Sequence, residues 1–427
     1  MLDIKLIREH PDVVRENLRK RGNGEKVQIL DELIAHDNEW RRLLTEANKL
    51  RHERRGITNS IASLKKEGKS IQAQISKGRM LDKEIVAIEK RRDEYKEKVD
   101  HILMRLPNLL HESVPVGEGE SGNVEVRVWG KPPDFSFTPV NHLEIAKNLE
   151  LIDDKRGAKV AGHGFLYLRD DLVLLDLALQ RFAIDFMIKK GFNLVEPPFM
   201  MKRRPYEGVT DLSDFENVMY KVEGEDLYMI ATAEHPLAAM YMDEVFLEED
   251  LPLKLVGVSP CFRKEVGAHG KYTKGLFRMH QFNKVEQFAF CLPENSWDVH
   301  EDLQGNAEEL YQELQLHHKV VNVCTGDIGA VAAKRYDINI WMADDVYREI
   351  GSNSNCTDYQ ARRLNIRYRE KEGQSPKGFV HTVNNTGIAT SRTMMAILEQ
   401  HQKSDGTVSI PDVLVKYMSG IRNLKLH

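Results

Sequence analysis

Residues 27–104, a stretch without proline, carry two ladders of mostly apolar residues whose spacing alternates between four and three. The ladders span residues 43–64 and 81–106. This spacing places a stripe along one face of a helix, and such a stripe is buried against a partner. Residues 67–70, Glu-Gly-Lys-Ser, favour a turn between the ladders. We therefore expect two long helices that fold back as an antiparallel hairpin, about 60 Å long if each helix holds about 40 residues.

Charge is unevenly distributed along the chain. Residues 1–105 carry 25 lysines and arginines against 19 acidic residues, whereas the remainder carries 36 against 47. Residues 41–69 hold nine basic and three acidic residues. A basic segment on an acidic body predicts a local contact with a polyanion, and a solvated helical face is the alternative that the pattern leaves open. The candidate phosphate-contacting residues are Arg41, Arg42, Arg51, Arg54, Arg55, Lys65 and Lys66.

Composition excludes several classes of protein. No segment reaches the run of about 18 apolar residues that a membrane-spanning helix needs. The first residues mix acids and bases and do not form a targeting sequence. The four cysteines form no Cys-x-x-Cys pair and, with the histidines, no set with zinc-ligand spacing. We expect a cytoplasmic protein without a membrane segment, a disulfide framework or zinc.

Beyond the hairpin the pattern predicts a larger second domain. Residues 107–145 are rich in proline and glycine and indicate a linker. Short strands without regular alternation with helices favour an antiparallel sheet. The predicted fold class is α+β, with a helical hairpin over residues 1–110 and an antiparallel sheet flanked by helices over residues 111–427. The expected helices lie at about 171–190 and 296–318, and the expected strands at 192–196, 228–231, 253–263 and 278–290.

The most informative segment is a predicted β-hairpin with a long, glycine-containing loop. Side chains alternate between the faces of a strand, so Arg278, Phe282 and Glu286 share one face. Arg263 and Glu265 share the matching face of the partner strand. Buried charges are costly unless they meet a ligand or each other. The pattern therefore fits a ligand with a phosphate, a planar base and an amine, and cross-strand ion pairs on a solvated face remain the alternative.

Three segments resemble the signature motifs of class II aminoacyl-tRNA synthetases. The string FRKE followed by GLFRMHQFNKVEQF resembles motif 2 in its seryl form. Residues 191–198 (GFNLVEPP) are similar to motif 1, whose proline, here Pro198, sits at the dimer interface in that class. Residues 387–392 (GIATSR) resemble motif 3. The resemblance covers essentially the whole chain, including PNLLHESVPVG in the linker, and points to the seryl-tRNA synthetase family.

The resemblance implies an enzyme that activates L-serine with ATP to seryl-adenylate, releasing pyrophosphate, and then transfers serine to the 3′-terminal ribose of tRNA(Ser). It implies a homodimer, a hairpin that contacts the long variable arm of the tRNA, and Mg²⁺ bound by Glu349 and Ser352, whose oxygens suit that ion. Whether tRNA(Sec) is charged as well stays open. The chemistry needs no protein nucleophile, because positioning and charge stabilisation carry it.

The resemblance also assigns residues to ATP. Arg263 and Arg278 are the implied catalytic residues, at the α-phosphate and the outer phosphates, because guanidinium binds oxyanions and stays charged. Phe282 and Arg392 are implied to hold adenine between them. The whole implied ATP-binding set is Arg263, Lys264, Glu265, Arg278, Phe282, Glu349, Ile350, Gly351, Ser352 and Arg392.

Serine offers an ammonium and a hydroxyl group, so carboxylates and hydroxyls are fitting partners, and a site that hydrogen-bonds the hydroxyl rejects alanine. Three positions depart from the family pattern: Gly351 replaces the usual serine, Asn353 a frequent cysteine and Asn385 a commoner glycine. We expect metal binding to be retained and the serine pocket to be slightly altered. The implied serine-binding set is Thr232, Ala233, Glu234, Arg263, Glu286, Asn384 and Thr386.

Two other functions compete with this interpretation. A related ligase that charges a carrier protein would not need a long basic hairpin. An RNA-binding protein with an inactive body would not be expected to keep Arg263, Glu265, Arg278, Glu349 and Arg392 together. Exchange of pyrophosphate into ATP separates the active from the inactive case, and transfer to tRNA separates a synthetase from a carrier ligase.

Overall fold

The computed structural model describes residues 1–22, 24–211, 218–265 and 275–426. The chain divides into two compact units, Met1–Pro107 and Asn108–His427. In the part of the chain so described, no helix is both long and apolar enough to cross a membrane. The helices of the first unit are α1 (Ile4–Glu9), α2 (Pro11–Lys20), α3 (Gly24–Lys66) and α4 (Gln72–Leu103).

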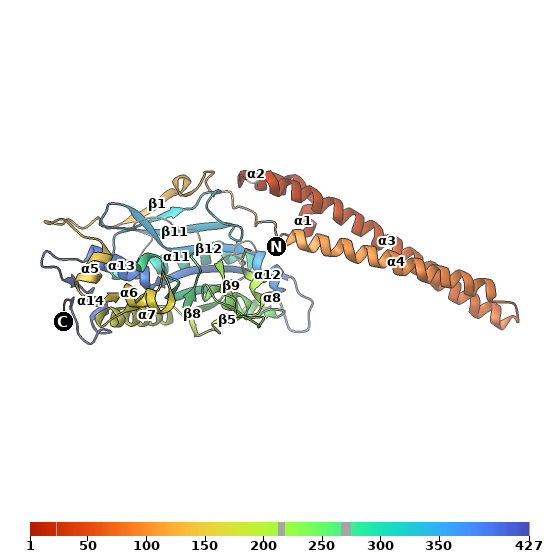
Figure 1. Cartoon of the computed structure of the whole chain (residues 1–427). Helices are drawn as coiled ribbons and strands as arrows, with labels where there is room; N and C mark the ends of the chain where they lie inside the picture. Colours follow the sequence, from red (N-terminus) through yellow and green to blue (C-terminus); the bar gives the residue numbers. More distant parts are fainter. Residues whose placement is uncertain (23, 212–217, 266–274, 427) are drawn as a thin grey trace. The chain divides into compact units, whose positions relative to one another are not determined.

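The predicted hairpin is confirmed, with α3 and α4 running side by side (Figure 1). Every ladder position is buried or half-buried, and Leu43, Ala47 and Ile88 form a core between the helices. Arg54 stands in the ladder because its guanidinium reaches across to the Asp82 carboxylate, with N···O distances of 2.7 and 3.1 Å. A Cβ added to Gly78 would lie 3.4 Å from that guanidinium, so this glycine packs against it.

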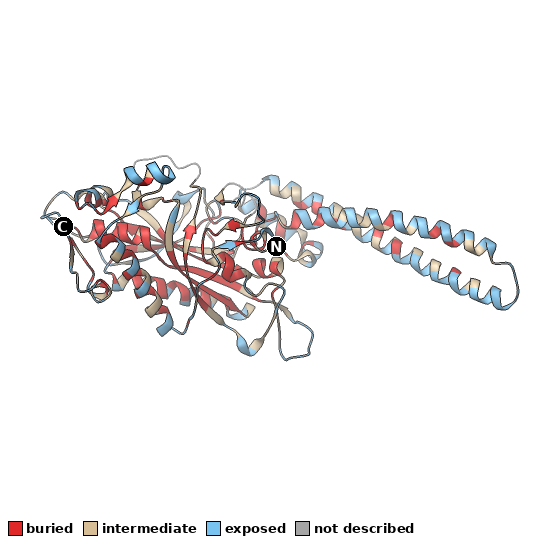
Figure 2. Ribbon diagram, turned by 60° about the horizontal axis from the view of Figure 1, so that its bottom comes forward, coloured by how far each residue is buried: buried red, intermediate tan, exposed pale blue. Residues whose placement is uncertain are grey.

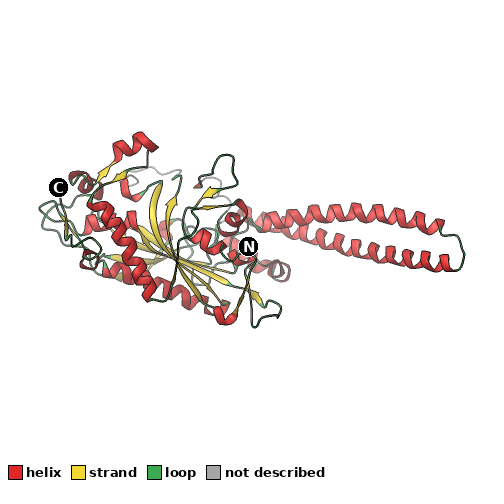
Figure 3. Cartoon of the chain, turned by 90° about the horizontal axis from the view of Figure 1, so that it is seen from below, coloured by secondary structure: helices red, strands yellow, loops and turns green. Residues whose placement is uncertain are grey.

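The second unit is built on an eight-stranded sheet (Figure 3). All neighbouring strands pair antiparallel except the parallel edge pair at one end, so the predicted antiparallel sheet is confirmed. In order across the sheet the strands are β1 (Val124–Trp129), β10 (His318–Asn322), β11 (Lys334–Trp341), β12 (Tyr347–Thr357), β15 (His381–Ala389), β9 (Gln281–Cys291), β8 (Leu253–Phe262) and β4 (Asn193–Val195).

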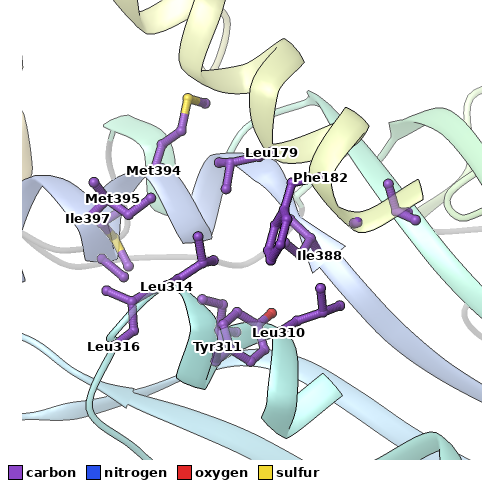
Figure 4. Close-up of a cluster of buried hydrophobic side chains, with 14 of the residues drawn as sticks. Leu179, Phe182, Leu310, Tyr311, Leu314, Leu316, Ile388, Met394, Met395 and Ile397 are labelled. Atoms are coloured by element: carbon purple, nitrogen blue, oxygen red, sulfur yellow. The ribbon is translucent and has the colours of Figure 1, made fainter. Parts of the chain in front are cut away.

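Apolar side chains on the two faces of this sheet enter two different cores. One core joins α7 (Asp171–Lys189), α11 (Ser296–Glu313) and α13 (Thr390–Gln400) to the strands (Figure 4). The other core involves the shorter helices α8 (Arg203–Val209), α10 (Glu234–Ala239) and α12 (Tyr359–Leu364). The central strands are therefore buried on both sides (Figure 2), which allows charged side chains among them to be shielded from water.

Smaller elements complete the second unit. They are the helices α5 (His142–Asn148), α6 (Asp154–Ala161) and α14 (Asp412–Val415), and the strands β2 (Ile152–Asp153), β3 (Tyr167–Leu168), β5 (Met200–Met201), β6 (Tyr228–Met229), β7 (Val245–Leu247), β13 (Arg367–Arg369), β14 (Gly378–Phe379), β16 (Val408–Ser409) and β17 (Asn423–Leu424).

Two expectations about this unit are wrong in detail. The linker at 107–145 contains β1, an edge strand whose alternating valines are exposed, so hydrophobic burial gave no signal for it. The helix expected at 296–318 ends at Glu313, because Gln315 has a φ of 54° and β10 begins three residues later.

Candidate active site

A cavity of about 480 Å³ opens where β8, β9, β12 and β15 meet the start of α10 and of α13. It is lined by most of the residues predicted for ATP and serine, although these come from six separate segments of the chain. The predicted residues that line the cavity are Thr232, Glu234, Arg263, Glu265, Phe282, Glu349, Ile350, Gly351, Ser352, Asn384, Thr386 and Arg392.

Two β-bulges bring side chains three residues apart onto one face. In β12, Gly351 pairs with Ile338 and Glu349 with Asn339, so one extra residue, Ile350, separates them. Alternation alone would place Glu349 and Ser352 on opposite faces, and the extra residue reverses the parity. Gly387 is the extra residue of β15. A Cβ there would lie 3.0 Å from the Val285 carbonyl oxygen, which explains the glycine.

Arg263 of motif 2 and Arg392 of motif 3 both line the cavity, and Arg392 lies in the first turn of α13. Arg263 follows β8, and its Nε donates to the carbonyl of Ala231 at 3.2 Å. Its guanidinium carbon lies 5.3 Å from the centre of the Phe282 ring. Arg392 donates to the Glu349 carbonyl at 2.7 Å, and its guanidinium lies 4.8 Å from the ring centre of Phe277. Phe277 is an aromatic neighbour of the site that the sequence did not suggest.

Four residues of the predicted set do not line this cavity. Arg278 lies before β9, and its Nε is 3.6 Å from a Glu265 carboxylate oxygen. Lys264 donates its backbone N–H to the Val218 carbonyl at 3.0 Å. Ala233 and Glu286 are buried immediately behind the lining residues. The middle of the motif 2 loop, residues 266–274, lies outside the described residues.

An acidic pair, half-buried Glu234 and buried Glu286, lies at the deep end of the site. Glu286 lies 2.6 Å from the ammonium of Lys284, and both side chains are less than a tenth exposed. Burial raises the pKa of Glu286. Burial and the nearby Glu286 carboxylate raise the pKa of Glu234 to about 7. Gly257 of β8 pairs with Glu286. The glycine lets the segment that carries Ala233 and Glu234 lie close to β8, since a Cβ at Gly257 would be 2.9 Å from the Ala233 side chain.

The sequence reasoning missed Lys284, although its position two residues before Glu286 on one strand put it on the same face. It also missed Arg335 and Asp337 on β11. Arg335 bonds Asp337 through two N–H···O contacts of 2.7 and 2.9 Å, and its Nη2 lies 3.6 Å from Glu349. Burial would raise the pKa of Glu349, but the charges of Arg392 and Arg335 lower it below its ordinary value.

The departures from the family pattern have structural explanations. Asn353 and Asn385 point away from the cavity, and their amides donate to the α11 carbonyls of His300 and Leu303 at 2.8 and 2.7 Å. Asn385 therefore contributes no side chain to the lining of the cavity. Gly351 borders the cavity, and a Cβ there would lie 3.0 Å from the Thr386 Cβ. The glycine makes room for the threonine.

The seven candidate phosphate-contacting residues of the hairpin divide into two groups. Three of them already have acidic partners within the hairpin: Arg42 with Glu39 and Glu46, Arg51 with Glu89, and Arg54 with Asp82. Within the described residues, the remaining candidates make no ion pair. These are Arg41, Arg55, Lys65 and Lys66.

Comparison with known proteins agrees with this arrangement. The family description "Seryl-tRNA synthetase N-terminal domain" matches residues 1–110, and "tRNA synthetase class II core domain (G, H, P, S and T)" matches residues 218–401. A serine–tRNA ligase of Methanocella arvoryzae is 53% identical over 425 residues, 99% of this chain and 100% of that protein. The chain belongs to the seryl-tRNA synthetase family. Its function is the one that this family is named for, the ATP-dependent ligation of serine to tRNA.

Solved structures of the family share the whole fold. The Pyrococcus horikoshii seryl-tRNA synthetase, complexed with ATP, has a TM-score of 0.96 and 50% identity, with 100% of both chains covered. The cytoplasmic serine–tRNA ligase of Naegleria fowleri, in complex with AMP, has a TM-score of 0.90 and 34% identity, covering 100% of this chain and 99% of that one.

Proposed function

We propose that this cavity is where L-serine and ATP react to form seryl-adenylate, and where tRNA(Ser) then accepts the seryl group. The observation that carries the proposal is the union in one cavity of Arg263, the Phe282 ring that its guanidinium faces and the Glu234 carboxylate, with Glu286 buried behind the lining. Phosphate, adenine and ammonium are the three groups that such partners recognise.

Arg263 is placed to bind both reacting groups. Its backbone and its Nε are held by the His280 and Ala231 carbonyls, so the guanidinium enters the cavity in a fixed direction. A fixed cation stabilises the charge that develops as a serine carboxylate oxygen bonds to the α-phosphorus and the bond to pyrophosphate breaks. Phe282 and Arg392 are proposed to supply the surfaces for adenine, and the structures of the two relatives contain ATP and AMP.

Mg²⁺ fits the donors at the other end of the cavity. Glu349, held ionised by two arginines, and Ser352 offer hard oxygens on one face because of the β12 bulge. The described residues contain no cluster of three or more His, Cys, Asp or Glu side chains that would hold a metal alone. A Mg²⁺ that keeps its waters and binds substrate phosphates needs only one or two protein ligands. Bound there, it would neutralise phosphate charge.

Selection of serine is assigned to the deep end. Glu234 and Glu286 are proposed to bind the ammonium, and the hydroxyl is proposed to be bonded by Thr232 and Thr386, with Asn384 alongside. Alanine would leave these polar groups unpaired, which costs far more than the loss of one contact.

The hairpin is proposed to bind the tRNA backbone through its unpaired basic residues. The protein is proposed to act as a homodimer through β4 and α7, because β4 is a sheet edge and apolar side chains are exposed there, with Leu194 51% and Leu177 56% exposed.

The direct test is aminoacylation of total tRNA with labelled serine, with alanine and threonine as controls and with exchange of pyrophosphate into ATP measured in parallel. Serine should be the amino acid that supports both reactions. Exchange without transfer to tRNA would refute the ligase assignment, and equal charging with alanine would refute the proposed hydroxyl site.

A further inference from the structure

Gln360 on α12 is fully buried and does not line the cavity, yet its side chain ends at the acidic pair. Its Nε2 donates to a Glu234 carboxylate oxygen at 3.3 Å and to the Val209 carbonyl at 3.0 Å. Its Oε1 accepts from the Thr382 hydroxyl at 2.7 Å. Within the described residues, the hydrogen bonds of this amide therefore link α8, the start of α10 and β15.

The orientation of this amide is determined by its partners. A backbone carbonyl can only accept a hydrogen bond, so the Val209 oxygen must face the NH₂ group of Gln360. The Thr382 hydroxyl then meets the oxygen of the amide. Because both ends are occupied, the side chain cannot flip, and its second N–H is directed at Glu234.

We infer that Gln360 is a positioning residue for serine binding: it holds the Glu234 carboxylate in place and ties it to α8 and to β15. This inference rests on the proposed role of Glu234 in binding the serine ammonium. Thr382 precedes Asn384 by two residues on β15, so the same amide connects Glu234 to the strand that carries the proposed hydroxyl partners. Gln360 would thus fix the distance between the ammonium and hydroxyl subsites without touching serine.

Electrostatics gives this contact a second consequence. Glu234 faces the Glu286 carboxylate, the Lys284 and Arg263 cations, and the neighbouring Cys356, Tyr206 and His235. Burial and Glu286 raise its pKa to about 7, whereas the hydrogen bond from Gln360 lowers it. Serine affinity should therefore rise as the pH passes through about 7, and loss of the Gln360 donor should move this transition to higher pH.

The experiment compares Gln360→Met and Gln360→Glu with Gln400→Met in the full-length protein, using exchange of pyrophosphate into ATP. Gln400 is the matched control, since it is a buried glutamine that bonds the His317 and Trp341 carbonyls away from the cavity. A hydrogen bond to a charged group typically changes affinity by about tenfold or more. We expect Q360M to raise the serine KM by that factor, to leave the ATP KM within about twofold, and to shift the pH profile upward.

The outcomes separate this inference from the proposed function. Equal rises of the serine and ATP KM, or a serine effect in Q400M as large as that in Q360M, would overturn the positioning role. If Q360M does not fold, Q360E decides, because it keeps the side-chain volume but has at most one O–H donor and cannot donate to both Glu234 and Val209. If Glu234→Gln loses serine binding while Q360M keeps an unchanged serine KM, the proposed role of Glu234 stands and only the positioning role of Gln360 is refuted. An unchanged serine KM in Glu234→Gln would refute the proposed role of Glu234 itself.

Discussion

Replacing Glu234 by glutamine should stabilise the protein at pH 8 while it impairs the enzyme. The pKa of this carboxyl rises from its ordinary 4.5 to about 7 in the folded chain. A shift of about 2.5 units corresponds to about 3 kcal/mol of unfolding free energy at 1.36 kcal/mol per unit. This is an upper bound, because Glu234 borders the cavity and is only partly shielded from water.

The direction of this change in stability with pH follows from proton binding. Below pH 4.5 the carboxyl is protonated in both the folded and the unfolded chain, so it imposes no penalty. Between pH 4.5 and 7 only the unfolded chain loses the proton, so stability falls with rising pH, and above 7 the penalty stays constant. Glutamine resembles the protonated acid in shape and removes the penalty. The advantage of the variant in unfolding free energy should therefore grow from near zero at pH 4.5 to at most about 3 kcal/mol at pH 8.

Urea unfolding at a series of pH values measures this difference, and three of the four tryptophans report on the second unit. Glu225→Gln, at an exposed position, is the control for loss of one charge. The serine KM of Glu234→Gln should rise at every pH above 7. A stability difference that does not change with pH, or a variant less stable than the parent at pH 8, would contradict the reasoning.

Four further results are expected. Arg263→Ala should reduce pyrophosphate exchange by at least about 100-fold with an unchanged circular dichroism spectrum, and exchange near the parental rate would contradict its role. Deleting residues 30–100 should leave the exchange of pyrophosphate into ATP unchanged and abolish aminoacylation of tRNA, because the hairpin holds none of the residues assigned to ATP or serine. In the full-length protein, Arg55→Glu combined with Lys65→Glu and Lys66→Glu should lower the slope of log K for tRNA binding against log salt concentration by about one for each lost phosphate contact. Arg42→Glu is the control and should change this slope less, because the charge of Arg42 is already paired. Gly78→Ala and Gly56→Ala should each stabilise the hairpin by about 0.5–1 kcal/mol in thermal unfolding, because glycine is costly inside a helix. Gly56 serves as the comparison, since a Cβ there would meet no atom within 4 Å.

The sequence predicted best those features that depend on neighbouring residues in the chain. The alternating ladders specified the hairpin because each helix must bury its own stripe, and motif 2 placed Arg263 and Phe282 because the segments that carry them pair with each other. Alternation within β9 also placed Glu286 on the same face as Phe282.

Features set by a partner strand could not be predicted in this way. The bulges at Ile350 and Gly387 exist only in relation to the strands beside them, so strict alternation misplaces Glu349 relative to Ser352. The roles of Gln360, Arg335 and Asp337 likewise depend on elements far away in the chain. The exposed strand β1 gave no signal of burial, since solvent covers its valines.

The asparagines behind the cavity have an evolutionary consequence. Asn353 and Asn385 fasten the pocket strands to the backbone of α11, a helix that contributes no residue to the lining of the cavity. Substitutions at these positions can shift the strands by small distances while every substrate-facing side chain stays the same. The shape of the pocket and its chemistry can therefore diverge separately, and relatives with identical lining residues need not hold an inhibitor equally well.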